Sequence, residues 1–217
     1  MTKPNVLVID AGLGNIGSVI AAFQRQNCEV QRLQQPPKPE ETKTITHAVL
    51  PGVGAFATGM QALRHYGWEK WIKETWCKPD RPLLGICLGM QLLSSLGTEG
   101  SSDGNIINGL DLIPGKVDRL NVNTKVVLPH VGWNEVEWND KANPLAQGLP
   151  TNSDMYFVHS YVFHTKDSKH RLAETDYSQR FTAVVGKGLC YGVQFHPEKS
   201  QRLGRQLIEN FLALGKC

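Results

Sequence analysis

Residues 82–91, PLLGICLGMQ, decide the fold of this chain, because they join an apolar run to a helical segment through a turn flanked by glycines. The run at residues 82–86 is typical of a buried strand, and residues 90–96 have the character of a following helix. Cys87 lies on the turn between two glycines. Larger side chains there would collide with the strand and the helix. The stretch therefore predicts a strand–turn–helix unit that presents a cysteine.

The first hundred residues repeat this alternation of apolar strands and amphipathic helices. Strands are expected at residues 5–10, 29–33, 47–50 and 82–86, and helices at residues 15–26, 59–76 (with a break near Gly67) and 90–96. Such alternation favours an α/β fold with a doubly wound, mostly parallel sheet, flanking helices and right-handed crossovers.

The second half of the chain changes character. Strand-like segments lie at residues 125–138, 155–163, 171–174, 182–185 and 189–195, with turns between them. They predict an antiparallel extension of the sheet. Ser200 is expected to cap a last helix, whose apolar residues recur at helical spacing from Leu203 to Leu214. No linker divides the chain, so residues 1–217 are expected to form a single domain.

The composition of the chain excludes several classes of function. The 217 residues are 41% hydrophobic and 20% charged, with a net charge of +3. No basic run argues for nucleic acid, no apolar stretch approaches the roughly 18 residues of a membrane span, and the first residues do not resemble a signal peptide. The five cysteines are Cys28, Cys77, Cys87, Cys190 and Cys217. Their odd number and wide spacing predict a reduced, cytoplasmic protein without a metal or other cofactor.

A second motif supplies the partners that a cysteine nucleophile needs. The apolar segment at residues 191–195 ends in His196, Pro197 and Glu198. In an extended segment residues i and i+2 point the same way, and Pro197 favours the extended conformation at His196. The carboxylate of Glu198 is thus expected to orient the imidazole of His196. We expect Cys87, His196 and Glu198 to form a catalytic triad.

The neighbourhood of Cys87 favours a nucleophile over a buried, inert thiol. A helix begins at this point and a central strand ends there, and both features favour a reactive thiolate and a ligand site. The remaining histidines have no carboxylate two residues onward at a strand end, and we interpret them as surface or packed residues: His47, His65, His130, His159, His164 and His170.

Amide hydrolysis also requires hydrogen-bond donors for the tetrahedral oxyanion. The backbone amide of Leu88, directly after the nucleophile, is one candidate. Gly52 and Val53 are candidates for the second, since they lie in a glycine-rich turn after the strand at residues 47–50. An ordinary β-to-α turn remains the alternative for that segment.

Together these motifs resemble those of the class I, or triad, glutamine amidotransferases. The resemblance is carried, in chain order, by PGVG at residues 51–54, GICLGMQ at residues 85–91 and QFHPE at residues 194–198, and it covers nearly the whole chain. It implies that glutamine is held by Gly52, Leu88, Gln91, Glu99, Ser160 and Tyr161. Glu99 is suited to pair with the α-ammonium group of glutamine.

Three further segments narrow the resemblance to the glutaminase subunits of imidazole glycerol phosphate synthases. They are DAGLGN at residues 10–15, PHVGWN at residues 129–134 and VHSY at residues 158–161. The resemblance implies a heterodimer with a cyclase subunit of (β/α)8 fold that receives the ammonia. It places Asn15, His130, Trp133 and Asn134 at that interface. Ala11 and Val131 depart from the usual Tyr and Met, and both lie in segments where the family meets its partner.

Three alternatives remain open at this point. Besides the glutaminase subunit of the histidine pathway, they are a glutaminase that serves another synthase, such as those for pyridoxal phosphate, anthranilate or guanylate, a non-catalytic α/β protein with a reactive cysteine, and a cysteine peptidase. The segments around Trp133 and Tyr161 speak against the first, and the intact His196–Glu198 pair speaks against the second. Gln91 and Glu99, sized for a free amino acid, speak against the third.

Overall fold

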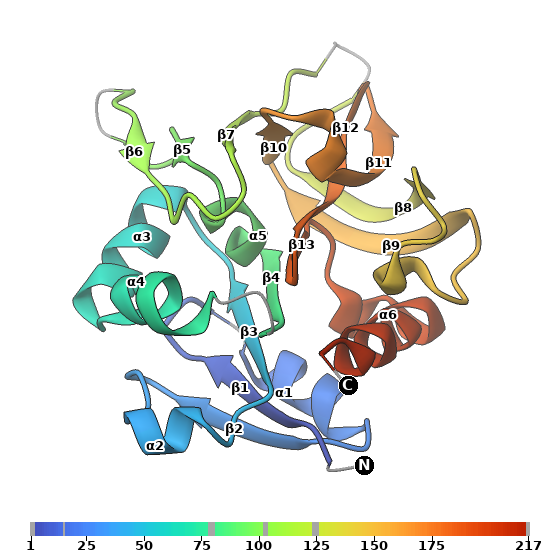
Figure 1. Ribbon diagram of the computed structural model, residues 1–217. Helices are drawn as coiled ribbons and strands as arrows, with labels where there is room; N and C mark the ends of the chain where they lie inside the picture. The colour runs from blue at the N-terminus through green and yellow to red at the C-terminus, as the bar shows by residue number, and fades with distance from the viewer. Residues whose placement is uncertain (1–2, 15, 78–80, 102–103, 123–125, 216–217) are drawn as a thin grey trace.

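A nine-stranded sheet forms the centre of the molecule (Figure 1). The computed structural model describes residues 3–14, 16–77, 81–101, 104–122 and 126–215. The strands lie in the order β2 (Glu29–Leu33), β1 (Asn5–Ile9), β3 (His47–Gly52), β4 (Leu83–Cys87), β13 (Cys190–Val193), β12 (Gln179–Lys187), β11 (Arg171–Tyr177), β8 (His130–Trp138) and β9 (Asn152–His159). The first five run parallel and the remaining pairs are antiparallel. The predicted doubly wound sheet with an antiparallel extension is therefore confirmed.

Helices cover both faces of this sheet. The helices α1 (Ile16–Gln24) and α6 (Gln201–Ala213) share one core with Val6 and Val8 of β1. The opposite core contains Leu7 and Ile9 of the same strand. There they pack with α3 (Phe56–His65), α4 (Trp68–Trp71) and the π-helical turn η1 (Ile72–Trp76). Strand β1 is apolar on both sides because successive side chains of a strand point to opposite faces.

A second sheet of four strands lies beside the first. Its order is β10 (Tyr161–Thr165), β7 (Gly115–Arg119), β5 (Leu96–Gly97) and β6 (Ile107–Asn108). The prediction of one strand at residues 155–163 is wrong, because the chain leaves the large sheet after His159 and enters the small one at Tyr161. Apolar residues lie on both sides of His159 and Ser160, so the pattern does not reveal the change of sheet.

Two helix predictions also need correction. The helix after Cys87 is α5 (Leu88–Leu92), which begins directly after the cysteine and has only five residues. Ser200 makes no side-chain capping bond to α6; its hydroxyl instead donates to the carbonyl of His196, 2.7 Å away, and accepts from the backbone amide of Tyr156 at 3.0 Å. The expected break near Gly67 is confirmed, since Gly67 has a left-handed conformation at the start of α4.

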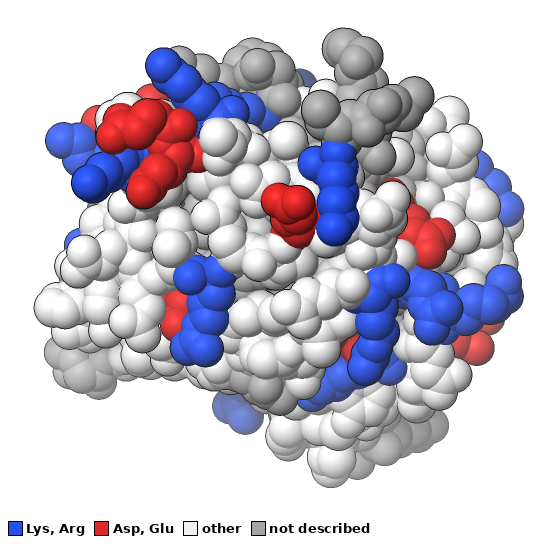
Figure 2. Space-filling model, turned by 90° about the horizontal axis from the view of Figure 1, so that it is seen from below, with Lys and Arg blue, Asp and Glu red and all other residues white. Residues whose placement is uncertain are grey.

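Shorter elements complete the chain, and charges are dispersed over the surface. These elements are α2 (Pro39–Thr42) and the 3₁₀ turns η2 (Pro144–Ala146), η3 (Ser168–His170) and η4 (Pro197–Lys199). Figure 2 shows Lys and Arg interspersed with Asp and Glu on one face. Within the described ranges, no helix combines the length and the apolar character needed to cross a membrane.

The two glycines beside Cys87 allow three backbone segments to meet. A β-carbon at Gly89 would lie 1.8 Å from the carbonyl oxygen of Leu50 in β3, and one at Gly85 would lie 2.6 Å from the carbonyl oxygen of Gly89. Both obstacles are backbone atoms, which no side-chain rotation can move. Strand β4, the turn and α5 are therefore packed as closely as their backbones permit.

We expect Gly89→Ala to destabilise the fold by more than about 3 kcal/mol, because β3 and α5 must separate to admit the methyl group. The free energy of unfolding from urea denaturation measures this. Gly188→Ala is the matched control: Gly188 has open space for a methyl group but a φ of +58°, so the substitution should cost only about 1 kcal/mol of left-handed backbone strain. Equal costs at the two positions would show that the contact with Leu50 does not limit the packing.

Candidate active site

Cys87 occupies the strained turn that the sequence predicts. It is the last residue of β4 and has φ 54° and ψ −110°, a conformation that residues other than glycine rarely adopt. Its side chain is nearly buried, with 6% of the residue exposed. Strain of this kind persists only where the surrounding structure imposes it, and the close packing at Gly85 and Gly89 does so here. The sulfur is thereby fixed at the carboxyl edge of the parallel strands.

His196 and Glu198 form the expected pair. Nδ1 of His196 lies 2.8 Å from Oε1 of Glu198, and the two side chains are only 6% and 4% exposed. The backbone amide of His196 donates to the carbonyl of Tyr156 at 2.8 Å. The Ser200 hydroxyl holds the His196 carbonyl from the other side, so β9 and the start of α6 together fix the histidine.

The surroundings of His196 favour its charged form. Burial lowers the pKa of His196, but interactions with Cys87 and Glu198 outweigh burial and raise that pKa to about 9. The other oxygen of Glu198 is buried and has no hydrogen-bond partner among the residues that the structure describes. The carboxylate is thus directed at the imidazole, where it stabilises an imidazolium next to the cysteine.

The thiol of Cys87 has two further neighbours. Its sulfur lies 3.7 Å from the carbonyl oxygen of Val158, to which the thiol donates, and 3.8 Å from Nε2 of Gln194. Gln194 is completely buried. Both contacts are long, so the sulfur is held weakly and can turn toward His196 or a substrate carbon.

A pocket of about 390 Å³ opens above the cysteine. Its lining includes eight of the predicted residues: Val53, Cys87, Leu88, Gln91, Glu99, Ser160, Tyr161 and His196. Two predicted residues lie behind the lining: Glu198 is behind His196, and Gly52 packs against Leu88. The pocket is thus built from β4, α5, the segment after β5 and the change of sheet at Ser160.

The polar groups of the pocket differ in what they offer a ligand. Glu99 is half-buried, and burial raises its pKa despite a hydrogen bond from the backbone of Phe56. Nε2 of Gln91 donates to the carbonyl of Tyr161 and to Oε1 of Gln194, both at 3.0 Å. Both amide hydrogens of Gln91 are therefore used within the protein, and it can offer a ligand only its oxygen.

The oxyanion donors are only partly in place. The amide of Val53 donates to the carbonyl of Leu13 at 2.9 Å, so in this conformation it faces away from the cysteine, and its role as an oxyanion donor stays a prediction. The segment that carries Leu13 is itself fixed, because Asp10 accepts from the amide of Gly12 at 3.0 Å and from Nε of Arg32 at 2.7 Å. Leu88 directly follows the cysteine and keeps its predicted place.

The predicted interface residues fall into three groups. Asn15 lies outside the described residues. His130 is only 2% exposed and stacks between aromatic rings, and its place at the partner interface stays a prediction. Trp133 is 48% exposed and Asn134 is half-exposed. With Val131, 55% exposed, Trp133 forms an apolar stretch of β8.

Some residues of the site were not predicted. Lys199 lines the pocket and lies over the ring of Tyr156, and His159 contributes a buried wall. Gln194 and Ser200 act behind the lining. Gln194 belongs to the QFHPE segment, and Ser200 follows that segment by two residues. The motif was therefore the sequence feature that could have pointed to both residues. No group of three or more potential metal ligands occurs among the described residues.

Comparison with known proteins gives the context of this geometry. The family model of "Glutamine amidotransferase class-I" matches residues 7–214. The "Imidazole glycerol phosphate synthase subunit HisH 1" of Prochlorococcus marinus is 50% identical over 214 residues, which are 98% of each chain. The "Imidazole glycerol phosphate synthase subunit HisH 2" of Methanococcus maripaludis is 39% identical over 207 residues, covering 95% of this chain and 98% of the relative.

Solved structures share the fold. A putative GMP synthase protein from Thermoplasma acidophilum aligns with a TM-score of 0.74 at 16% identity, covering 99% of this chain and 95% of the other. A glutamine amidotransferase from Thermotoga maritima aligns with a TM-score of 0.65 at 20% identity, covering 96% and 82%. With the family match over almost the whole length, the chain belongs to the class I glutamine amidotransferases.

Proposed function

We propose that this chain is the glutaminase subunit of an imidazole glycerol phosphate synthase in histidine biosynthesis. Residues 1–217 act as one cytoplasmic domain that hydrolyses glutamine to glutamate and ammonia. The ammonia passes to a cyclase subunit of (β/α)8 fold in a heterodimer. The observation that carries the proposal is the convergence of Cys87, His196 and Glu198 at one pocket, in a chain 50% identical to a HisH subunit over 98% of its length.

The chemistry follows from the roles of three side chains. His196 takes the thiol proton of Cys87, and the sulfur attacks the side-chain carbonyl carbon of glutamine. When the tetrahedral intermediate collapses, the carbon–nitrogen bond breaks and ammonia leaves with the proton from His196. Water then attacks the thioester, the carbon–sulfur bond breaks, and glutamate and the free thiol result. Glu198 orients the ring of His196 and stabilises its charge throughout.

The pocket supports a free amino acid as substrate. Glu99 offers a carboxylate to the α-ammonium group, and the oxygen of Gln91 offers a second acceptor. Gly52, Leu88, Ser160 and Tyr161 are proposed to bind the remainder of glutamine through the backbone. The volume of about 390 Å³ suits a ligand of this size.

The partner surface is proposed to include the exposed part of β8. Val131 and Trp133 are large apolar residues that a free chain leaves in water. Asn134 flanks them, and Asn15 is assigned to the same surface by resemblance alone. Covering such residues with the cyclase removes apolar area from water.

The first expected outcome concerns the nucleophile. Cys87→Ala and Cys87→Ser should each abolish glutaminase activity without unfolding the chain. A glutamine-like alkylating agent should label Cys87 and spare Cys28 and Cys77, because burial raises the pKa of both thiols, that of Cys77 to about 11. Peptide mass spectrometry identifies the labelled residue. Equal labelling of another cysteine, or an active Cys87→Ala variant, would contradict the assignment.

The second expected outcome concerns the pH dependence of kcat. Ammonia departure needs the proton on His196, whose pKa is raised to about 9, so kcat should decline as the pH rises through about 9. Glu198→Gln removes one cause of the raised pKa, and the decline should then begin at lower pH, with part of the activity retained at neutral pH. His196→Ala should approach the defect of Cys87→Ala. An unchanged alkaline decline in Glu198→Gln would show that the carboxylate has only a structural role.

The third concerns activation by the cyclase. The Val53 amide is bound to the Leu13 carbonyl, so the isolated chain is expected to stabilise the oxyanion with Leu88 alone. One missing donor costs about 2.7–4 kcal/mol, or roughly a hundred- to thousandfold in rate. The cyclase with its nucleotide ligand is proposed to favour a flipped Val53 peptide. Glutaminase activity should therefore rise by orders of magnitude in the complex, chiefly in kcat.

Variants at Gly52 separate this explanation from simple stabilisation. Gly52→Ala should weaken the activation and Gly52→Pro should prevent it, because each restricts rotation of the peptide between residues 52 and 53. Basal activity and thermal unfolding of the same variants serve as controls for folding. Full kcat from the isolated wild-type chain would contradict the peptide flip.

A further inference from the structure

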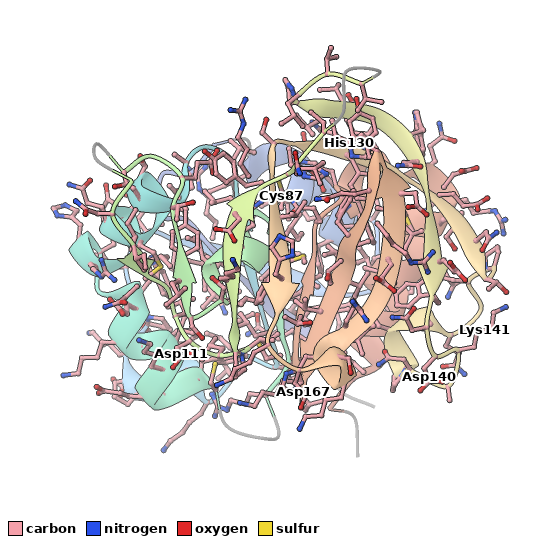
Figure 3. The ribbon with its side chains drawn as sticks, turned by 90° about the horizontal axis from the view of Figure 1, so that it is seen from above. Cys87, Asp111, His130, Asp140, Lys141 and Asp167 are labelled. Atoms are coloured by element: carbon pink, nitrogen blue, oxygen red, sulfur yellow. The ribbon has the colours of Figure 1, made fainter. Side chains whose placement is uncertain are left out.

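Two buried histidines connect β8 to the wall of the pocket. Nδ1 of His130 lies 3.0 Å from Nε2 of His159, and Nδ1 of His159 lies 2.9 Å from the carbonyl oxygen of Tyr161. Only 2% of His130 and 6% of His159 is exposed. Figure 3 shows His130 on the same side of the molecule as Cys87. The triad chemistry uses neither histidine.

The carbonyl of Tyr161 determines where the protons lie. A carbonyl oxygen only accepts, so Nδ1 of His159 must carry a hydrogen and its Nε2 must accept. Nδ1 of His130 then donates to that Nε2, and both rings are neutral. Burial lowers the pKa of His159 to about 3 and that of His130 to about 4, which agrees with neutral rings at neutral pH. The chain of hydrogen bonds thus has one direction, toward Tyr161.

The same carbonyl receives a second donor from the other side. Nε2 of Gln91 donates to it at 3.0 Å and also to Oε1 of Gln194. The amide of Gln194 in turn faces the sulfur of Cys87 at 3.8 Å. The Tyr161 carbonyl is therefore the point at which the histidine pair and the glutamine-facing side chain of Gln91 meet.

The histidine pair is itself held firmly. The ring of His130 stacks on those of Tyr177 and Phe157, with ring centres 4.0 and 4.9 Å away. Nδ2 of Asn134 lies 3.4 Å from Nε2 of His130, at the half-exposed end of the chain of hydrogen bonds. Neither ring can turn without losing its stacking or a hydrogen bond, so the position of the Tyr161 carbonyl is tied to β8.

We propose that His130 and His159 are positioning residues for glutamine: they hold the Tyr161 carbonyl, and through it Gln91, in the arrangement that binds the amino acid. The inference rests on the proposed function, since it assumes that glutamine occupies the pocket bounded by Gln91 and Tyr161. The hydrogen bonds of the pair run to the Tyr161 carbonyl and not to Cys87 or His196, although the charge of His196 also acts on His159. Loss of the pair should therefore raise the KM for glutamine more than it lowers kcat.

Two polar substitutions of His159 form the central test. The amide of an asparagine occupies the position of Nδ1 and keeps a donor for the Tyr161 carbonyl, whereas that of a glutamine occupies the position of Nε2 and does not. His159→Asn should keep KM within about threefold of wild type, and His159→Gln should raise it about tenfold or more, with kcat changed less than about threefold. A role in filling space alone would favour the larger glutamine side chain instead.

Two further variants complete the design. The activity of every variant is measured with the full chain saturated with the cyclase. His130→Phe keeps the stacking but leaves Nε2 of His159 without its donor, and should raise KM by an intermediate factor. His170→Asn is the matched control, because His170 is also buried but lies on η3 with Asp167, which Figure 3 places on the side opposite Cys87. It should leave both KM and kcat unchanged. Thermal unfolding verifies that each variant is folded.

The outcomes separate this inference from the proposed function. A wild-type complex that does not hydrolyse glutamine would overturn the proposed function itself. An active wild type in which His159→Gln binds glutamine as well as His159→Asn, or better, would overturn the positioning role alone. If His130→Phe does not fold, the comparison of His159→Asn with His159→Gln still tests the positioning role.

Discussion

The carbonyl of Leu50 lies where a β-carbon at position 89 would have to be, and this contact governs the centre of the molecule. It brings β3, β4 and α5 together so closely that Cys87 must adopt a strained backbone conformation with positive φ. The sulfur consequently projects from the edge of the sheet at one fixed place. The pocket, His196 and the segment carrying Val53 are all arranged around that place. The catalytic geometry therefore begins as a packing constraint between backbones.

Electrostatic interactions then divide the buried histidines into two kinds. His196 has a carboxylate partner, and its pKa is raised to about 9 despite burial. The hydrogen bonds of His130 and His159 join neutral groups, and burial lowers their pKa values to about 4 and about 3. In the proposed mechanism, histidine thus carries a proton at one position beside the pocket and acts as a neutral, directional hydrogen-bonding group at another. Whether the pKa of a buried histidine is raised or lowered depends here on whether a carboxylate lies beside it, and not on the depth of burial alone.

Local patterns predicted the parts of the molecule that depend on local chemistry. The strand–turn–helix at Cys87 and the pair His196–Glu198 follow from spacing and glycine sterics, and both are found as expected. The change of sheet at Ser160 was missed because apolar residues lie on both sides of it. The sequence left His130 as either a surface or a packed residue and did not reveal the bond from Val53 to Leu13, because each placement depends on a segment distant in the chain. Such contacts leave no periodic trace in a single sequence.

The change of sheet at Ser160 has a consequence for the length of the amino acid that fits. Glu99 follows β5 in the small sheet, whereas Cys87 ends β4 in the large one, so the two ends of the pocket belong to different sheets. If Glu99 holds the head group of the ligand as proposed, the distance between that head group and the amide at Cys87 depends on how the two sheets pack against each other. In the proposed binding mode, discrimination between glutamine and an amino acid one methylene shorter would therefore depend on the hydrophobic core that joins the sheets. A substitution in that core, remote from every polar group of the pocket, would change the distance between Glu99 and Cys87.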